Sequence, residues 1–249
     1  MPEIGLSLGS SFPACDPFAA MELAGSVSDP VIGNIGIGSV QICPQNAPVK
    51  IAELVIDELA ALYPETSFRL HANVRLLDRP CLFDLGSIER HPEYRSVLVR
   101  MLSFLSAPYS IHAGVGKHAP SALEQIGRCL ALEEEAGVPV AIEGLYPGAG
   151  PAFASWEDYE LFLRHDVCFA IDLSHLNILR HKTGFVPDGL VEALVSHSNC
   201  IEVHLSGNNG TRDSHERVNE GAWWLSVLGC VNPSATIFYE GRQKSPETT

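Results

Sequence analysis

The sequence predicts an α/β fold in which parallel strands close into a barrel inside a ring of helices, a (β/α)₈ TIM barrel. Short β-branched segments recur eight times along the chain, and segments with helical spacing follow most of them. Parallel strands need long crossover connections, which helices usually supply. The length of 249 residues suits one barrel of this kind.

Eight segments have the composition of buried strands. They cover residues 4–10, 37–43, 67–74, 109–115, 138–145, 167–176, 199–207 and 235–241. The second unit is irregular, because residues 11–36 hold Gly, Pro and Ser around a short helical stretch near 18–23. An open doubly wound sheet is the alternative fold. Its glycine-rich phosphate loop would follow the first strand, whereas GNIGIG (33–38) precedes a strand.

The connecting segments carry helix signals. Apolar residues at helical spacing predict helices over 54–62, 94–105 and 190–195, the second opened by Pro92 and the third by Pro187. Ser121 with Glu124 predicts a capping box, Gly137 ends that helix, and Ser155 with Asp158 repeats the capping pattern in weaker form. No linker or low-complexity segment divides the chain, so we expect a single barrel domain over 1–249.

Composition excludes several classes of partner. The chain has 16 basic and 30 acidic residues, a net charge of −14, and no basic stripe to meet phosphates, so no nucleic-acid partner is expected. No apolar run is long enough to cross a bilayer, and the start lacks signal-peptide features. Seven cysteines without a C-x-x-C pair suit buried thiols in a reducing compartment. We expect a soluble, cytoplasmic protein with no membrane partner.

Potential metal ligands gather at the carboxyl ends of the predicted strands. They are His71, His112, Glu143, Asp172, His204 and Glu240 on strands three to eight, with His175 three residues after Asp172, and with Asp213 and His215 in the loop after His204. In a barrel these ends face one mouth, where active sites are built. Four carboxylates gathered there would repel one another unless cations neutralised them. Nine ligands imply two or three ions, and mixed His and carboxylate suits zinc, iron or manganese.

A second group of polar residues is close to these ligands in sequence. Candidates for substrate binding are Asn73, Asn208, Asn209, Arg212 and His118. Each asparagine could equally cap a loop, while a guanidinium beside a metal cluster suits a substrate carboxylate. Cys43 precedes Pro44, and we expect it to be a buried thiol. Of Trp223 and Trp224, which lie in a helical stretch, at least one is expected in the core.

The ligand order resembles that of endonuclease IV, a trinuclear zinc enzyme of the xylose isomerase-like barrel superfamily. The shared order is His, His, Glu, Asp-x-x-His, His, Asp-x-His, Glu. The resemblance implies one ion on His71, His112 and Glu143, and a second that shares Glu143 with Asp172, His204 and Glu240. It implies a third on His175, Asp213 and His215.

One segment resembles another branch of the superfamily, the multinuclear non-haem iron-dependent oxidative enzymes of the type found in methanobactin biosynthesis. It reads IEVHLSGNNGTRDSH (201–215) and precedes a Trp-Trp-Leu stretch. This resemblance implies two or three iron ions (Fe²⁺/Fe³⁺), O₂, and a thiol-containing peptide or small amino-acid-derived substrate. A peptide substrate would call for a separate recognition protein. The stretch DLSHLN (172–177) differs from the Asn-rich stretch of that family and is closer to endonuclease IV.

Three other functions stay open. A metal-dependent sugar isomerase or epimerase would need one ion on Glu143, Asp172, His204 and Glu240, and would leave the other five ligands without a role. An endonuclease IV-like zinc phosphodiesterase must bind the phosphates of a DNA duplex with basic residues. The obvious basic candidates near the mouth are only Lys117, Arg212 and Arg242. A non-enzymatic barrel with structural metals would more often use cysteine ligands. We therefore predict an iron-dependent oxidoreductase of a biosynthetic pathway, with zinc or manganese as the alternative metals.

Overall fold

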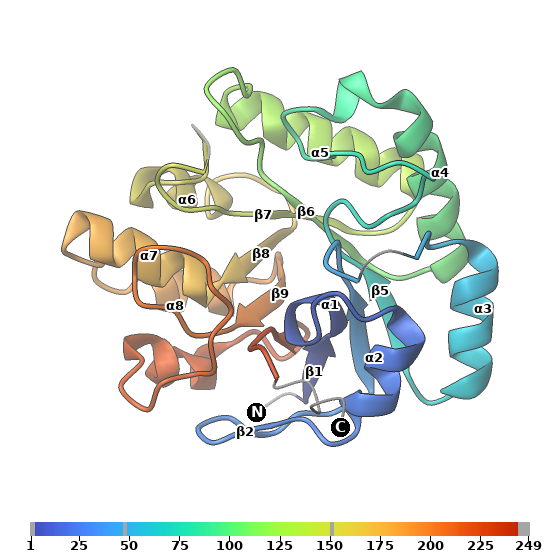
Figure 1. Ribbon diagram of the computed structural model, residues 1–249. Helices are drawn as coiled ribbons and strands as arrows, with labels where there is room; N and C mark the ends of the chain where they lie inside the picture. Colours follow the sequence, from blue (N-terminus) through green and yellow to red (C-terminus); the bar gives the residue numbers. More distant parts are fainter. Residues whose placement is uncertain (1–2, 47–48, 150–151, 244–249) are drawn as a thin grey trace.

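The barrel is built from one parallel sheet. The computed structural model describes residues 3–46, 49–149 and 152–243. Eight strands pair in the order β5-β4-β1-β10-β9-β8-β7-β6, and neighbouring strands in this order run parallel. A parallel bridge between His71 and Ser110 joins the two ends of the sheet, so the barrel is nearly closed. Figure 1 shows the helices arranged around its outside.

Each barrel strand lies within one of the eight predicted segments, which confirms the (β/α)₈ prediction. The strands are β1 (Ile4–Ser7), β4 (Ser39–Ile42), β5 (Ser67–Leu70), β6 (Tyr109–His112), β7 (Val140–Glu143), β8 (Phe169–Asp172), β9 (Cys200–Leu205) and β10 (Thr236–Tyr239). The irregular second unit contains a small antiparallel hairpin of β2 (Ser28–Asp29) and β3 (Gly33–Asn34). Thus Gly33 belongs to the hairpin, and Gly36 and Gly38 lie in the segment that leads to β4, so that none of these glycines forms a phosphate loop after the first strand.

Helices follow the strands as predicted. They are α1 (Leu8–Ser11), α2 (Pro17–Ala24), α3 (Glu53–Leu62), α4 (Pro92–Leu105), α5 (Ala122–Ala136), α6 (Trp156–Phe162), α7 (Leu173–Thr183) and α8 (Leu190–Ser196), with the 3₁₀ helices η1 (Ile88–Arg90) and η2 (Trp223–Cys230). Of these, α1, α7 and η1 were not predicted from the sequence. The Ser121–Glu124 capping box is present, and Gly137 ends α5 in the left-handed conformation. Ser155 caps α6, and Trp224 is buried in η2.

All eight predicted strand segments are longer than the observed strands, and in two of them a helix begins directly after the strand. The segment 4–10 ends as a strand at Ser7, and α1 follows at once. The segment 167–176 ends as a strand at Asp172, whose Oδ1 accepts hydrogen bonds from the backbone N–H groups of Ser174 and His175 and so caps α7. Residues 173–176 are all buried, and a buried helical turn cannot be told from a strand by apolar pattern. The correction places His175 on the first turn of a helix.

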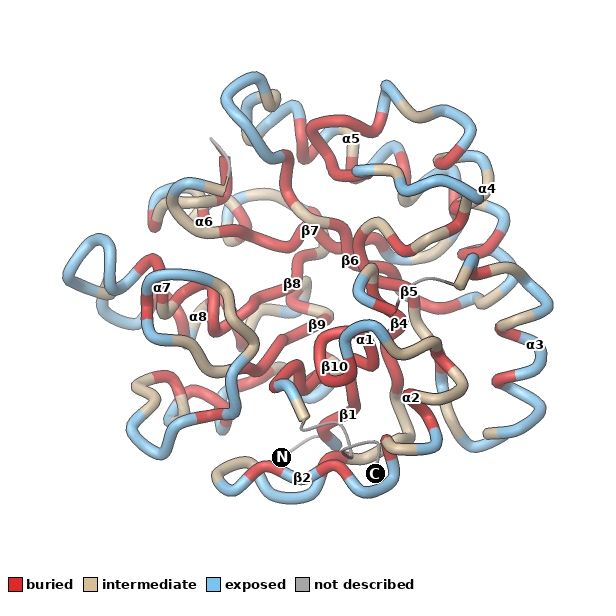
Figure 2. The backbone as a smooth tube through the Cα atoms, viewed as in Figure 1, coloured by how far each residue is buried: buried red, intermediate tan, exposed pale blue. Residues whose placement is uncertain are grey.

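The strands divide apolar from polar side chains. Alternate residues such as Ile142, Ile171 and Val203 are fully buried in the hydrophobic core. The opposite faces carry polar groups that meet across the interior. Arg69 on β5 and Gln41 on β4 both donate hydrogen bonds to Glu202 on β9, although neither β4 nor β5 is next to β9 in the sheet. In Figure 2 the barrel strands are mostly buried, while the outer faces of the helices are exposed. Polar side chains therefore fill the inside of the barrel.

None of the helices in the described part of the chain combines the length and apolarity that a membrane span requires.

Candidate metal centre

Six of the predicted ligands stand where strands β5 to β10 end. His112, Glu143 and Asp172 are the last residues of β6, β7 and β8, and His204 is the penultimate residue of β9. His71 and Glu240 directly follow β5 and β10. Strand register brings pairs together: His112 is aligned with Glu143, and Asp172 with His204. The shared direction of the strands thus gathers all six at one mouth.

The remaining three ligands come from a helix and a loop. His175 lies in the first turn of α7, and its Nδ1 is 2.9 Å from the carbonyl oxygen of Gly144. Asp213 and His215 lie in the loop after β9, which a bridge between Gly207 and Glu216 folds back on itself. His215 has a φ of +46°. These contacts bring all nine predicted ligands into one cluster.

Ligand atoms in this cluster form four overlapping groups, in each of which the atoms lie within 4.8 Å of one another. The groups are His71, His112 and Glu143; Glu143, Asp172 and His204; His71, His204 and Glu240; and Asp172, His175 and Asp213. The first is the predicted first ion site. Residues predicted to hold the second ion are divided between the next two groups.

The third predicted ion site differs from the observed grouping. His175 and Asp213 are joined by Asp172, with His175 Nε2 3.4 Å from Asp172 Oδ2 and 3.5 Å from Asp213 Oδ2. His215 instead lies between two carboxylates, its Nε2 3.1 Å from Asp213 Oδ2 and its Nδ1 3.5 Å from Glu240 Oε2. His215 therefore connects the third site to Glu240.

Unpartnered atoms at the centre of the cluster fit bound cations. Glu143 Oε2, Asp172 Oδ2, His204 Nδ1 and His215 Nδ1 are buried, and no hydrogen-bond partner is found for them among the described residues. Leaving buried polar atoms unpaired is costly, so such atoms usually have a missing partner. Anionic oxygens and imidazole nitrogens that converge in this way are the donors that zinc, iron and manganese accept. The residues thus fit two or three metal ions.

Exposure indicates where the cluster meets solvent. The side chain of His112 is 33% exposed, against 2% for Glu143 and 0% for His204. Asp213 and His215 are also partly exposed, at 18% and 14%. The open side of the centre is therefore the side of His112, with a smaller opening at the loop after β9.

The pKa values of the cluster reflect burial and mutual charge. Burial lowers the pKa of His71 to about 4 despite the nearby Glu143 carboxylate, so this imidazole is neutral and able to bind metal at pH 7. Burial raises the pKa of Asp172 to about 6, against the effect of His175. Burial alone would lower the pKa of His204, but Glu143 and Glu240 raise it well above its ordinary value. Without bound metal ions, protons on His204 and Asp172 therefore offset part of the negative charge of the carboxylates.

A second layer of residues behind the ligands was not found from the sequence. Glu202, Ser110 and Gln41 lie inside the barrel and hydrogen-bond His204, His71 or each other. Ser10 donates to Glu240 Oε1 at 3.3 Å. The available signal was spacing: Glu202 precedes His204 by two residues, which places both on one face of a strand.

The candidate substrate residues have mostly local partners. Asn73 donates to the carbonyl oxygen of Cys81, Asn208 Oδ1 accepts from the backbone N–H of Gly210, and Asn209 Oδ1 accepts from that of Thr211. These are the loop-capping contacts that sequence left open as an alternative. Arg212 and His118 are exposed. A substrate contact for any of the five stays a prediction.

The Cys43 thiol is buried, as predicted. Its Sγ lies 2.8 Å from Ser7 Oγ.

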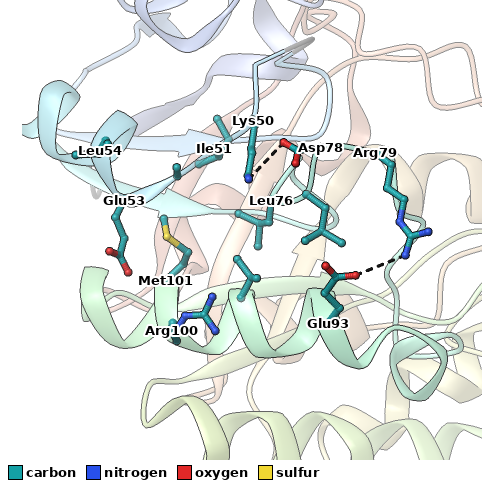
Figure 3. A pocket seen from close by; sticks show the side chains of 13 residues that line it. Lys50, Ile51, Glu53, Leu54, Leu76, Asp78, Arg79, Glu93, Arg100 and Met101 are labelled. Carbon is teal, nitrogen blue, oxygen red and sulfur yellow. Dashed lines mark ion pairs between the residues drawn. The ribbon is translucent and has the colours of Figure 1, made fainter.

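One surface pocket lies away from the metal cluster. It measures about 840 Å³ and lies between the start of α3 and the face of α4, with Ile51, Leu76 and Met101 on its walls (Figure 3). Ion pairs Lys50–Asp78 and Arg79–Glu93 cross its rim. None of the nine ligands lines it.

Fold and site together define a (β/α)₈ TIM barrel with a cluster of metal-binding residue types at its mouth. Similar solved structures include a D-tagatose 3-epimerase-like protein (16% identity, TM-score 0.68, covering 98% of this chain and 91% of that one). An AP endonuclease of family 2 from Brucella melitensis is similar over 98% of this chain and 95% of that one, at 15% identity and a TM-score of 0.64. A xylose isomerase domain-containing protein from Salmonella typhimurium is similar over 96% and 88%, at 10% identity and a TM-score of 0.64.

Comparison with protein-family models and with curated proteins finds no match. At these identities, the likeness to solved structures establishes the fold, while the reaction has to be argued from the site.

Proposed function

We propose that the protein is a multinuclear metalloenzyme that uses two or three iron ions and O₂ to oxidise a thiol-containing peptide or a small amino-acid-derived molecule. The observation that carries this proposal is the convergence of nine His and carboxylate side chains with unpartnered, buried ligand atoms. Iron is preferred because the segment 201–215 resembles the iron-dependent oxidative enzymes. The similar solved structures carry the names of epimerases and AP endonucleases, so the choice of oxidation rests on the site and on this segment.

The ligand groups differ in their exposure to solvent, and their expected roles follow from this difference. His71, His112 and Glu143 form the group nearest solvent, which is where a substrate thiolate would enter. The two groups that contain His204 are buried, and in the neighbouring group the ring of Tyr146 packs 5.0 Å from that of His175. Bound iron would supply one-electron redox chemistry and positions for O₂ and for the thiolate.

Zinc-dependent phosphodiester hydrolysis is the second candidate. The named AP endonuclease and the Asp172–His175 spacing favour it. The net charge of −14 opposes it, because even three bound divalent ions would leave a charge of −8 on a chain that must approach phosphates.

Sugar epimerisation is the third candidate, and the D-tagatose 3-epimerase-like structure favours it. One ion held by Glu143, Asp172, His204 and Glu240 would suffice for that reaction. The other five ligands would then have no role, although His175 and Asp213 form a compact group with Asp172. The ligand count therefore favours a multinuclear centre.

Metal analysis of protein purified without added metal, paired with Mössbauer spectroscopy, is the first test. Two or three irons per chain are expected. Protein reconstituted anaerobically with iron should then consume O₂ when cysteine-containing peptides or small thiols are supplied, and His112→Ala should abolish the uptake. His181→Ala, an exposed histidine outside the nine, is the matched control. Iron-loaded protein that consumes no O₂ with any thiol would overturn the proposal, and zinc with phosphodiesterase activity, or one manganese with epimerase activity, would replace it.

A further inference from the structure

We propose that Glu202 is a positioning residue that determines which ring nitrogen of His204, and through Ser110 which ring nitrogen of His71, faces the metal ions. The inference rests on the metal centre of the proposed function and is independent of the oxidation chemistry.

Glu202 directly orients His204. It lies on β9, is 1% exposed, and its Oε1 is 2.7 Å from His204 Nε2. An ionised carboxylate only accepts hydrogen bonds, so Nε2 must carry the proton. The lone pair is then on Nδ1, which is the buried atom without a partner and lies 3.5 Å from Glu143 Oε2. His204 therefore presents Nδ1 to the cluster.

Ser110 extends the same control to His71. The hydroxyl of Ser110 donates its single proton to Glu202 Oε1 at 2.5 Å. Toward His71 Nδ1, which lies 2.8 Å away, the hydroxyl oxygen can then only accept. Nδ1 must carry the proton, and the lone pair is on Nε2, 3.5 Å from Glu143 Oε2. One carboxylate thus orients two histidines, which use opposite ring nitrogens.

The charge of Glu202 is held in place by its surroundings. Arg69 Nη1 lies 3.4 Å from Glu202 Oε2, and Gln41 Nε2 donates to Oε1 at 2.7 Å. Arg69 is itself fixed by Thr236, to which its Nη2 donates at 2.7 Å, and by the ring of Phe238. A buried carboxylate with these partners stays ionised and immobile, so it accepts the hydrogen bonds that fix the orientation of both histidines.

Zinc-loaded protein supplies the test, because zinc is diamagnetic and needs no redox chemistry. Long-range ¹H–¹⁵N correlation spectra of the imidazoles report which nitrogen carries the proton. We expect the proton of His204 on Nε2 and that of His71 on Nδ1. The opposite proton position on His204 would overturn the inference without touching the proposed function, whereas a protein that binds neither zinc nor iron would overturn both.

Two variants separate positioning from folding. Ser110→Ala should release His71 alone, so that the imidazole signal of His71 changes and that of His204 does not. Glu202→Leu should affect both histidines and weaken zinc binding by about 10–100-fold. Thermal unfolding of each variant in the presence of chelator reports folding separately. An unchanged His71 signal and unchanged zinc affinity in Ser110→Ala would overturn the relay even if Glu202→Leu does not fold.

Discussion

Oε2 of Glu143 lies 3.5 Å from Nδ1 of His204 and, on its other side, 3.5 Å from Nε2 of His71. The same oxygen is 3.6 Å from Nε2 of His112. Glu143 is therefore common to two of the ligand groups, one open to solvent and one buried. A carboxylate in this place can bridge two ions, which makes it the most informative single residue of the cluster.

Metal stoichiometry should distinguish bridging from peripheral ligands. We expect Glu143→Ala to lose two ions per chain, because both of its groups become incomplete. His215→Ala should lose at most one, because within the described ranges His215 contacts the carboxylates of Asp213 and Glu240 alone. Elemental analysis after gel filtration measures both, with His181→Ala as the control. Equal losses in the two variants would contradict a bridging Glu143.

Removal of metal should destabilise the protein. Glu143, Asp172, Asp213 and Glu240 are gathered in one cluster, and bound cations would neutralise them. A ligand that binds only the folded state raises stability, so chelation should lower the unfolding temperature and returned metal should restore it. Differential scanning calorimetry at several metal concentrations checks this. An unfolding temperature independent of metal would contradict the assigned centre.

Two glycines offer a matched pair of substitutions near and away from the mouth. A Cβ on Gly114, which follows β6, would lie 2.6 Å from the Cα of Gly86, so Gly114→Ala should destabilise by about 1–3 kcal/mol. A Cβ on Gly127 in α5 meets nothing within 4 Å. Gly127→Ala should therefore stabilise by about 0.5–1 kcal/mol through helix propensity. Urea unfolding measures both, and effects of the same sign would refute the explanation.

Asp29 should make stability depend on pH in the acid range. Burial alone would raise the pKa of Asp29, but hydrogen bonds from the Tyr239 hydroxyl and three backbone N–H groups hold it below 3.8. Because the folded-state pKa is depressed, the stabilisation is present above the unfolded pKa and is lost as pH falls through the folded pKa. Asp29→Asn should cost about 2 kcal/mol at pH 7 and progressively less below about pH 4.

The control for this prediction is Asp57→Asn on the exposed face of α3. Urea unfolding between pH 2.5 and pH 7 measures the difference between variant and parent. A cost for Asp29→Asn that stays constant over this range would show that the charge of Asp29 does not contribute.

Much of the fold was readable from the sequence because its signals are local. Each barrel strand lies within a predicted segment, and the capping box at Ser121 sets the start of α5. The failures came where local signals are ambiguous. The pattern of residues 173–176 fits a buried strand as well as a buried helical turn. The hydrogen bonds that the backbone N–H groups of Ser174 and His175 donate to Asp172 show that a helix starts there.

The sequence by itself determined which residue types meet at the mouth. Parallel strands bring their carboxyl ends to one side, so the positions of His71, Glu143 and Glu240 within their strands were enough to place them together. Tertiary structure alone decided how the ligands are grouped and what stands behind them. Asp213 joins His175, and Glu202 reaches Ser110 and Gln41, through contacts between elements far apart in the sequence. Such contacts depend on barrel closure, which no local pattern of residues encodes.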